Sequence, residues 1–95
     1  MKKVAINICH GGFNLSPEAL GLYAELAGIA DAHTVYAWDI PRDDAILIGI
    51  IQDLADTADG EFSKLKIVEI PDDVEWEIGE YDGVEWIAEV HRKWQ

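Results

Sequence analysis

The stretch that decides the fold is VAINICHGGFNLSPE, residues 4–18. Residues 3–8 are mostly apolar without strict alternation, a pattern that predicts a strand covered on both faces. The pair Gly11-Gly12 then breaks the run. Ser16 is a strong N-cap residue and Pro17 suits the first helical position, so a helix is expected to begin here. The N-terminal part of the chain therefore predicts a strand, a tight loop and a helix in succession.

The middle of the chain predicts a second helix. Gly28 is the expected end of the first helix, and residues 33–38 are read as a short strand or extended segment. Apolar residues at helical spacing predict a second helix that begins at Asp43 or Asp44 and runs to about Ala58. The alternative is a strand over residues 45–51, because that run is rich in β-branched side chains.

The C-terminal part predicts strands. Residues 65–70 read as a strand that Pro71 stops. The pair Asp82-Gly83 separates two alternating runs, residues 74–81 and 84–90, which is a strong signal for a β-hairpin. A C-terminal helix over residues 84–94 is the alternative. The glutamates of this region are expected on a solvated strand face; they are Glu75, Glu77, Glu80, Glu85 and Glu89.

Together these elements predict a single small α/β domain over residues 1–95, with α+β as the other possibility. The expected order is β-α-β-α-β followed by an antiparallel hairpin. The first strands are expected to be parallel, joined by right-handed crossovers, with the two helices packed on one single-layer sheet.

Composition excludes several classes of function. The chain has 95 residues, nineteen Asp and Glu against seven Lys and Arg, and a formal net charge of −12. This charge disfavours binding to duplex nucleic acid and to an anionic membrane surface. A single cysteine, Cys9, excludes an internal disulfide framework and fits a reducing compartment, and we expect no signal peptide or membrane span. The acidity is read either as a solvated surface or as a decoy for a basic protein.

Both ends of the chain resemble one known family. The opening run INICHGGFNLS, residues 6–16, and a closing run over residues 70–94 that contains IPDDVEWEI, EYDGVEWIAE and HRKW are similar to a family of small uncharacterised proteins encoded by bacteriophages and prophages. The resemblance implies an accessory protein made in the cytoplasm of a bacterial host. It also implies that the protein counters host defences, by blocking a protein or by sequestering a nucleotide signal. The family has no established activity, so no catalytic residue follows from the resemblance.

The best candidate site in the sequence is the loop over residues 11–16, because free N–H groups where a strand gives way to a helix can bind an anion. In that reading Phe13 or Trp94 stacks on a base and scarce cations supply charge. The purely structural alternatives are that Gly11 and Gly12 only form a turn, that Phe13 packs in the core, and that residues 91–94 are a solvated tail. The proposed ligand-binding set is Cys9, His10, Gly11, Gly12, Phe13, Asn14, Ser16, Arg42, His91, Arg92, Lys93 and Trp94.

The sequence leads to a hypothesis of a non-enzymatic homo-oligomer that binds a nucleotide-like anion at this loop. The alternative is an inhibitor whose acidic, tryptophan-bearing hairpin occupies a basic site on a host protein. A weaker third hypothesis is a small hydrolase or transferase acting on nucleotides. No cofactor is expected, and no metal site, because Cys9, His10, His33 and His91 lack the spacing of metal ligands.

Overall fold

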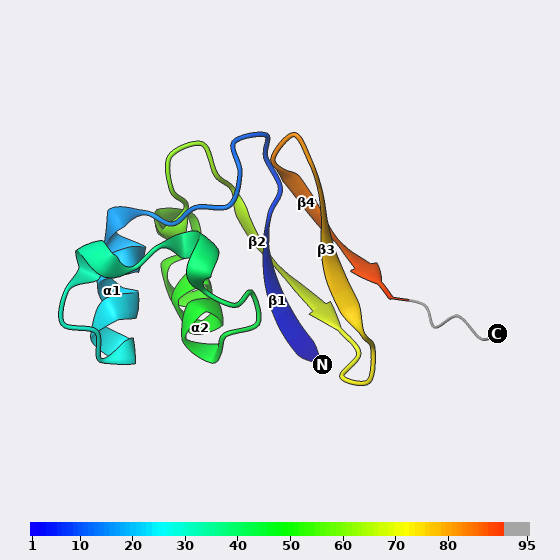
Figure 1. Ribbon diagram of the computed structural model, residues 1–95, viewed down its shortest axis with the longest axis horizontal. Helices are drawn as coiled ribbons and strands as arrows, with labels where there is room; N and C mark the ends of the chain where they lie inside the picture. The colour runs from blue at the N-terminus through cyan, green and yellow to red at the C-terminus, as the bar shows by residue number, and fades with distance from the viewer. Residues whose placement is uncertain (91–95) are drawn as a thin grey trace.

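The computed structural model describes residues 1–90, and it is an α+β fold built in three layers (Figure 1). One layer holds the helices, the next a two-stranded sheet, and the third a β-hairpin. The helices are α1 (Pro17–Ala27) and α2 (Ala45–Leu54), with 3₁₀ turns η1 (Ala32–Thr34), η2 (Ala37–Asp39) and η3 (Ala55–Ala58); the strands are β1 (Lys2–Asn7), β2 (Leu65–Ile70), β3 (Trp76–Tyr81) and β4 (Val84–Glu89).

The sheet topology differs from the prediction. β1 and β2 are antiparallel, with Lys2 opposite Ile70 and Asn7 opposite Leu65, and β3 and β4 form a separate antiparallel sheet. The predicted parallel strands in one sheet are therefore wrong. A parallel pair needs each crossover to end in a strand of the same sheet. Here both helices fall within the single connection between β1 and β2, and the chain returns in the opposite direction.

Residues 33–38, read as a short strand or extended segment, form no strand: local hydrogen bonds bend the segment into η1 and η2, and Val35 and Tyr36 between them are extended. The Asp31 carboxylate accepts a hydrogen bond from the backbone N–H of His33, and the Thr34 hydroxyl donates to the Asp31 carbonyl. Bonds from the backbone and then the side chain of His33 hold the pKa of Asp31 below its usual value. Such side-chain bonds compete with a strand ladder.

The helix boundaries follow the sequence signals closely. The Ser16 hydroxyl accepts a hydrogen bond from Ala19 N and caps α1, Pro17 is its first residue, and Gly28 ends it in the left-handed region at φ 74°. The Asp44 carboxylate caps α2 by accepting from Ile46 N. The second helix is confirmed over Ala45–Leu54, but it ends four residues before the predicted end: Ala55 takes a φ of 49°, and a separate 3₁₀ turn, η3, then runs to Ala58. No helix among the described residues is both long and apolar enough to span a bilayer.

The apolar interior lies on both faces of the β1–β2 sheet. On one face Ala5, Leu65 and Ile67 pack in a cluster with residues of both helices. Val4 and Ile6 are also buried, but they alternate with Ala5 and so point to the opposite face, toward the hairpin layer. Both faces of β1 are thus covered, as its mostly apolar run without strict alternation predicts.

The hairpin around Asp82-Gly83 is confirmed. Both turn residues have positive φ, 52° and 88°, as a tight hairpin turn of this type requires. The register places Ile78 opposite Ile87 on the inner face and Gly79 opposite Trp86 on the outer face. This excludes the helical alternative for Val84–Glu89; the rest of that alternative, residues 91–94, lies outside the described residues.

Candidate functional site

The predicted ligand loop, residues 11–16, leads into the helix α1, and two of its N–H groups, those of Leu15 and Ser16, have acceptors within the chain. Ser16 N donates to the carbonyl of Ala58 over 2.9 Å, and Ala19 N donates to the Ser16 hydroxyl over 3.1 Å. Pro17, at the first helical position, has no N–H. The donors nearest the start of α1 are therefore engaged by the protein's own atoms, whereas the N–H groups of residues 11–14 have no acceptor among the described residues.

The glycines of this loop are explained by close packing. A Cβ atom at Gly11 would lie 1.6 Å from the carbonyl oxygen of Phe62, and one at Gly83 would lie 2.4 Å from the carbonyl oxygen of His10. Gly12 has open space around it but a φ of 104°, a conformation that L side chains rarely adopt. These glycines allow the loop before α1, the loop before β2 and the hairpin turn to touch.

Asn7 is the polar centre of this contact. It is fully buried, and its side-chain amide donates to the carbonyls of Cys9 over 2.6 Å and of Gly83 over 2.8 Å. Its side-chain oxygen accepts from the backbone N–H of Lys64 over 2.8 Å. Asn7 thus joins the end of β1 to both neighbouring loops, and every polar group of its side chain is satisfied.

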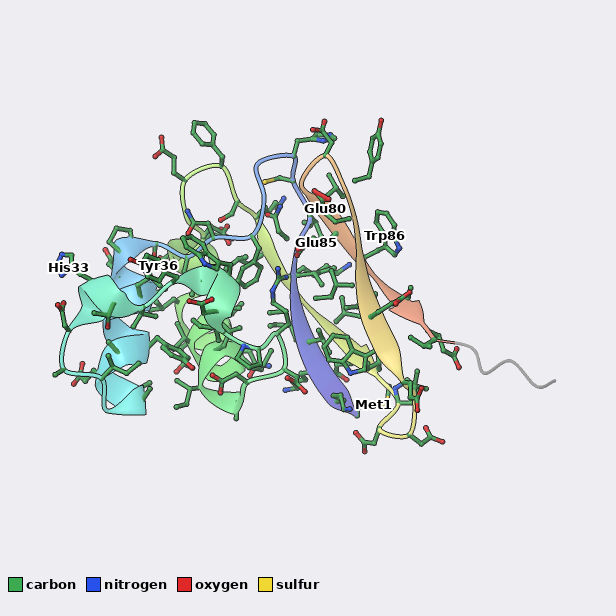
Figure 2. The ribbon with its side chains drawn as sticks, in the orientation of Figure 1. Met1, His33, Tyr36, Glu80, Glu85 and Trp86 are labelled. Atoms are coloured by element: carbon green, nitrogen blue, oxygen red, sulfur yellow. The ribbon has the colours of Figure 1, made fainter. Side chains whose placement is uncertain are left out.

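Arg42 and Glu85 form a buried ion pair beside Asn7. Arg42 Nη1 and Nη2 donate to the two carboxylate oxygens of Glu85 over 2.6 and 2.8 Å, and Asn7 N donates to the same carboxylate over 2.8 Å. The Arg42 guanidinium also lies 3.6 Å from the centre of the Phe13 ring. Figure 2 shows Glu85 on the inner side of the hairpin, directed toward β1.

The Arg42–Glu85 ion pair changes the roles that the sequence predicted for both residues. Glu85 is only 8% exposed, so the prediction that it lies on a solvated face is wrong, whereas Glu75, Glu77, Glu80 and Glu89 are exposed as predicted. A bidentate carboxylate partner satisfies Arg42, which is therefore committed to the fold. Phe13, half-buried beneath the guanidinium, packs in the structure near the core.

The other predicted site residues are spread around this end of the molecule. The Cys9 thiol donates to the carbonyl of Phe62 over 3.0 Å, and His10 is exposed with its ring 3.5 Å from the Asp82 carboxylate. Asn14 is exposed, and its side-chain oxygen accepts from Leu15 N. The predicted tail residues His91, Arg92, Lys93 and Trp94 lie outside the described residues.

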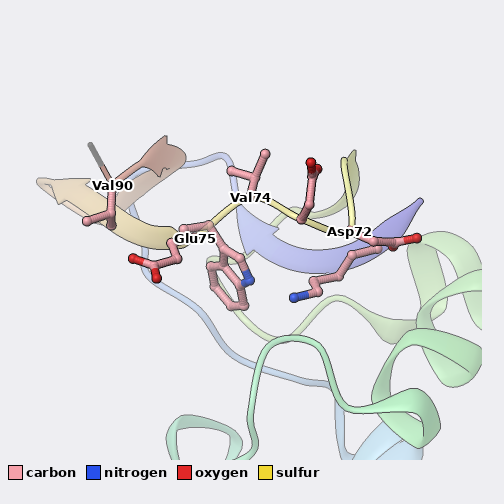
Figure 3. Close-up of a pocket in the computed structure, with 7 residues that line it drawn as sticks. Asp72, Val74, Glu75 and Val90 are labelled. Atoms are coloured by element: carbon pink, nitrogen blue, oxygen red, sulfur yellow. The ribbon is translucent and has the colours of Figure 1, made fainter. Parts of the chain in front are cut away.

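Several hollows lined by described residues lie outside residues 11–16. One of about 500 Å³ is an open acidic hollow at the start of the hairpin, drawn in Figure 3. A more apolar one of about 460 Å³ lies between α1 and η1. The first is lined by Lys2, Asp72, Asp73, Val74, Glu75, Trp76 and Val90, and the second by Pro17, Leu20, Gly21, Ala32, His33, Val35 and Tyr36.

No other part of residues 1–90 covers the outer face of the β3–β4 hairpin. The sequence predicted this exposed face only in part. Two tryptophans on one hairpin raised the possibility of an exposed patch. The register places them on opposite faces: Trp76 is half-buried on the inner face, and Trp86 is 47% exposed on the outer one (Figure 2). Tyr81, which shares the outer face with Trp86, is 77% exposed.

Comparison with known proteins does not indicate which surface of the molecule is functional. Within residues 1–90, no three His, Cys, Asp or Glu side chains are grouped so that they could hold a metal ion. Comparison with known protein families, with curated proteins and with solved structures found no match. The function must therefore be argued from the chain's own surface.

Proposed function

We propose that this protein is a non-enzymatic interaction protein that docks the outer face of the β3–β4 hairpin onto a basic surface of a partner protein. The family resemblance of its two ends favours a phage accessory protein, with a host defence protein as the partner. Occupying the basic surface would prevent that partner from binding its own anionic target.

The observation that carries the proposal is the composition of the hairpin's outer face. Glu77, Gly79 and Tyr81 of β3 share that face with Val84, Trp86 and Ala88 of β4. Trp86 lies over Gly79, where a Cβ atom would come within 2.3 Å of the indole. The indole is therefore held in place and remains about half exposed, and Tyr and Trp are the side chains most enriched at protein interfaces.

Charge indicates the chemistry of the partner. Nineteen Asp and Glu oppose seven Lys and Arg, and one of those cations, Arg42, is neutralised by Glu85. Exposed Glu75 and Glu77 flank the aromatic residues of the outer face. Complementary charge speeds diffusional encounter and excludes partners of the same charge, so a basic surface fits best.

The small-ligand hypothesis has weaker support. It needs free main-chain donors near the start of α1 and a nearby cation, but Leu15 N, Ser16 N and Ala19 N already have acceptors. Arg42, the one described cation of the predicted set, is bound to Glu85. Ligand binding at this loop therefore stays a prediction, and the acidic interaction face is the better-supported function.

Site-specific photocrosslinking tests the proposal. A photoreactive phenylalanine analogue replaces Glu77 on the outer face, and in a control variant it replaces Asp53, which is exposed on the far side of the fold on α2. Both variants are expressed in bacteria and irradiated. We expect one basic protein to be captured from position 77 and not from position 53, and raised salt to prevent its capture.

Two results would contradict the proposal. The first is capture of the same protein from both positions, because that indicates attraction to net charge without a defined face. The second is a captured partner whose own crosslinked segment is acidic or apolar. Either result would leave the outer face without a role.

A further inference from the structure

We propose that the end of the molecule formed by Phe62 and Tyr81 selects arginine side chains on the basic partner. We call this surface the loop end, and it consists of Phe62, Tyr81 and the exposed carboxylates Glu61, Glu80 and Asp82. The inference rests on the proposed function, because it names the chemical group that the basic partner presents. It adds a second contact region, which shares Tyr81 with the outer face of the hairpin.

Three loops from distant parts of the sequence converge at this end (Figure 1). Gly11 lies against the backbone of Phe62, and Gly83 lies against the backbone of His10 and Gly12. The Cys9 thiol also donates to the carbonyl of Phe62. These close backbone contacts hold the loop before β2 and the hairpin turn in fixed positions, so their exposed side chains project from a rigid base.

Phe62 is in an unfavourable state for a residue whose role is only structural. Its φ is 61°, in the left-handed region, where a bulky residue costs free energy that glycine avoids. Its side chain is 76% exposed, so burial of the ring does not compensate for that cost. Only the Phe62 backbone is used by the fold, through the contacts with Gly11 and Cys9. A strained backbone that carries a solvent-exposed ring points to a contact made outside the chain.

Tyr81 supplies a second exposed ring at the same end. Tyr81 is the last residue of β3 and is followed by the turn residues Asp82 and Gly83. Gly83 lies against the backbone of the loop that carries His10. The side chain of Tyr81 is 77% exposed. Glu80 and Asp82, on either side of Tyr81, are exposed as well. The loop end therefore combines aromatic faces with carboxylates, of which Glu80 also accepts from Gly83 N and Asp82 lies 3.5 Å from the ring of exposed His10. Exposed Lys64 follows Phe62 by two residues.

This combination favours arginine over lysine. A guanidinium is planar, stacks on aromatic faces, is weakly hydrated and binds carboxylates through two parallel hydrogen bonds, whereas a lysine ammonium is a strongly hydrated point charge. The same chemistry occurs inside the chain, where the Arg42 guanidinium lies on the Phe13 ring and binds Glu85 through both nitrogens. The partner is thus expected to present arginine-bearing loops.

Two peptides of equal charge test the inference, hexa-arginine and hexa-lysine, each blocked at both ends. Their affinities are measured by calorimetry at about 0.15 M salt. We expect the wild-type protein to bind hexa-arginine about fivefold more tightly than hexa-lysine. Phe62→Gly and Tyr81→Thr should each bring the ratio toward one without changing net charge. Trp38→Ser is the matched control, because Trp38 is 71% exposed next to Tyr36, away from the loop end.

A ratio near one in the wild-type protein would overturn the inference and leave the proposed function standing, since both peptides would still bind. Failure of both peptides to bind would count against the proposed function itself. Equal loss of the ratio in Trp38→Ser would show that the loop end is not the site. Thermal melting gives a separate check: Phe62→Gly should melt at or above the wild-type temperature, and a lower melting temperature would indicate a structural role for the ring.

Discussion

Arg42 and Glu85, which are 43 residues apart in the sequence, together complete the open edge of β1. β2 pairs with one edge of β1, and on the other edge Ala5 N donates to the carbonyl of Arg42 while Asn7 N donates to the carboxylate of Glu85. The two residues are joined by their own bidentate ion pair. A connecting loop and the hairpin thus take the place of a neighbouring strand, which attaches the third layer to the second.

Removing one partner of this pair should destabilise the fold strongly. Glu85→Ala leaves a buried guanidinium and the N–H of Asn7 without an acceptor, so we expect a loss of about 3 kcal/mol of unfolding free energy. Glu77→Ala, on the outer face of the same hairpin, should change stability by less than about 0.5 kcal/mol. Urea denaturation of both variants measures the difference. Equal stability of the two variants would mean that the ion pair contributes little.

Asn7 should also be intolerant of a substitution that keeps the shape of its side chain. In Asn7→Asp a carboxylate oxygen replaces the amide group that donates to the carbonyls of Cys9 and Gly83. Three oxygens then face one another in a buried position, and we expect a loss of about 2 kcal/mol. Denaturation at neutral pH measures this loss. A variant as stable as the wild type would show that the Asn7 amide bonds are not needed to hold the loops together.

Local signals predicted the parts of the fold that local interactions determine. Ser16, Pro17 and Gly28 bound the first helix, and Asp82-Gly83 marks the hairpin turn, because caps and tight turns are satisfied by residues a few positions away. The direction of β2 relative to β1 depends on how the helices between them pack, which no short stretch of sequence encodes. Of the two readings of residues 33–38, the strand failed because Asp31 and Thr34 hydrogen-bond the backbone locally, whereas Val35 and Tyr36 are extended.

The role of Glu85 could not be read from the sequence. In β4 the apolar residues fall on both faces: Ile87 shares the inner face with Glu85, and Trp86 lies on the outer one. Alternation alone therefore does not show which face is buried. The acceptor requirement of Arg42 decides it, and Arg42 reaches Glu85 only once the chain has folded. For the same reason the sequence did not show that Ser16 N is engaged, since its acceptor is the carbonyl of Ala58.

Gly11 and Gly21 should respond in opposite directions to substitution by alanine. Gly11→Ala places a methyl group 1.6 Å from the carbonyl oxygen of Phe62, so the two loops must separate and we expect a loss of at least about 2 kcal/mol. Gly21→Ala, in open space on α1, should instead stabilise the protein by about 0.5–1 kcal/mol. Thermal and urea unfolding compare the two. A tolerated alanine at position 11 would mean that the loop contact is loose.

Stability should decline in alkaline solution through Tyr23. Its hydroxyl donates to the Asp44 carboxylate, and this bond, together with burial, raises the pKa of Tyr23 to about 12. Because the folded pKa lies above the ordinary value of 10.0, the contribution is complete below pH 10 and is lost as the pH rises toward 12.

The variant Tyr23→Phe isolates this effect. It should be about 1 kcal/mol less stable than the wild type near neutral pH, since a hydrogen bond to a charged group is lost. The gap between the two proteins should close between pH 10 and 12, as followed by urea denaturation across that range. A gap that persists at pH 12 would mean that Tyr23 does not titrate as its bond to Asp44 requires.

Nucleotides should leave the melting temperature unchanged. A ligand present at a hundredfold excess over its Kd stabilises a protein by roughly 2.7 kcal/mol, a shift that thermal melting detects easily. With Ser16 N and Ala19 N already bound within the chain, we expect no such shift from mono-, di- or cyclic nucleotides. A clear shift that Gly12→Val abolishes, in a variant that still folds, would instead support ligand binding at the glycine loop.

The most direct test of the acidic interaction face is the affinity of the crosslinked partner for two charge-neutralised variants. One is Glu75→Gln with Glu77→Gln, just before and on the outer face of the hairpin, and the other is Asp53→Asn in α2 with Asp56→Asn in η3. Both remove two charges from exposed positions. We expect the hairpin variant to bind at least about tenfold more weakly and with a smaller salt dependence, and the α2 variant to bind like the wild type. Equal weakening of the two variants, or full affinity of the hairpin variant, would contradict docking through the hairpin.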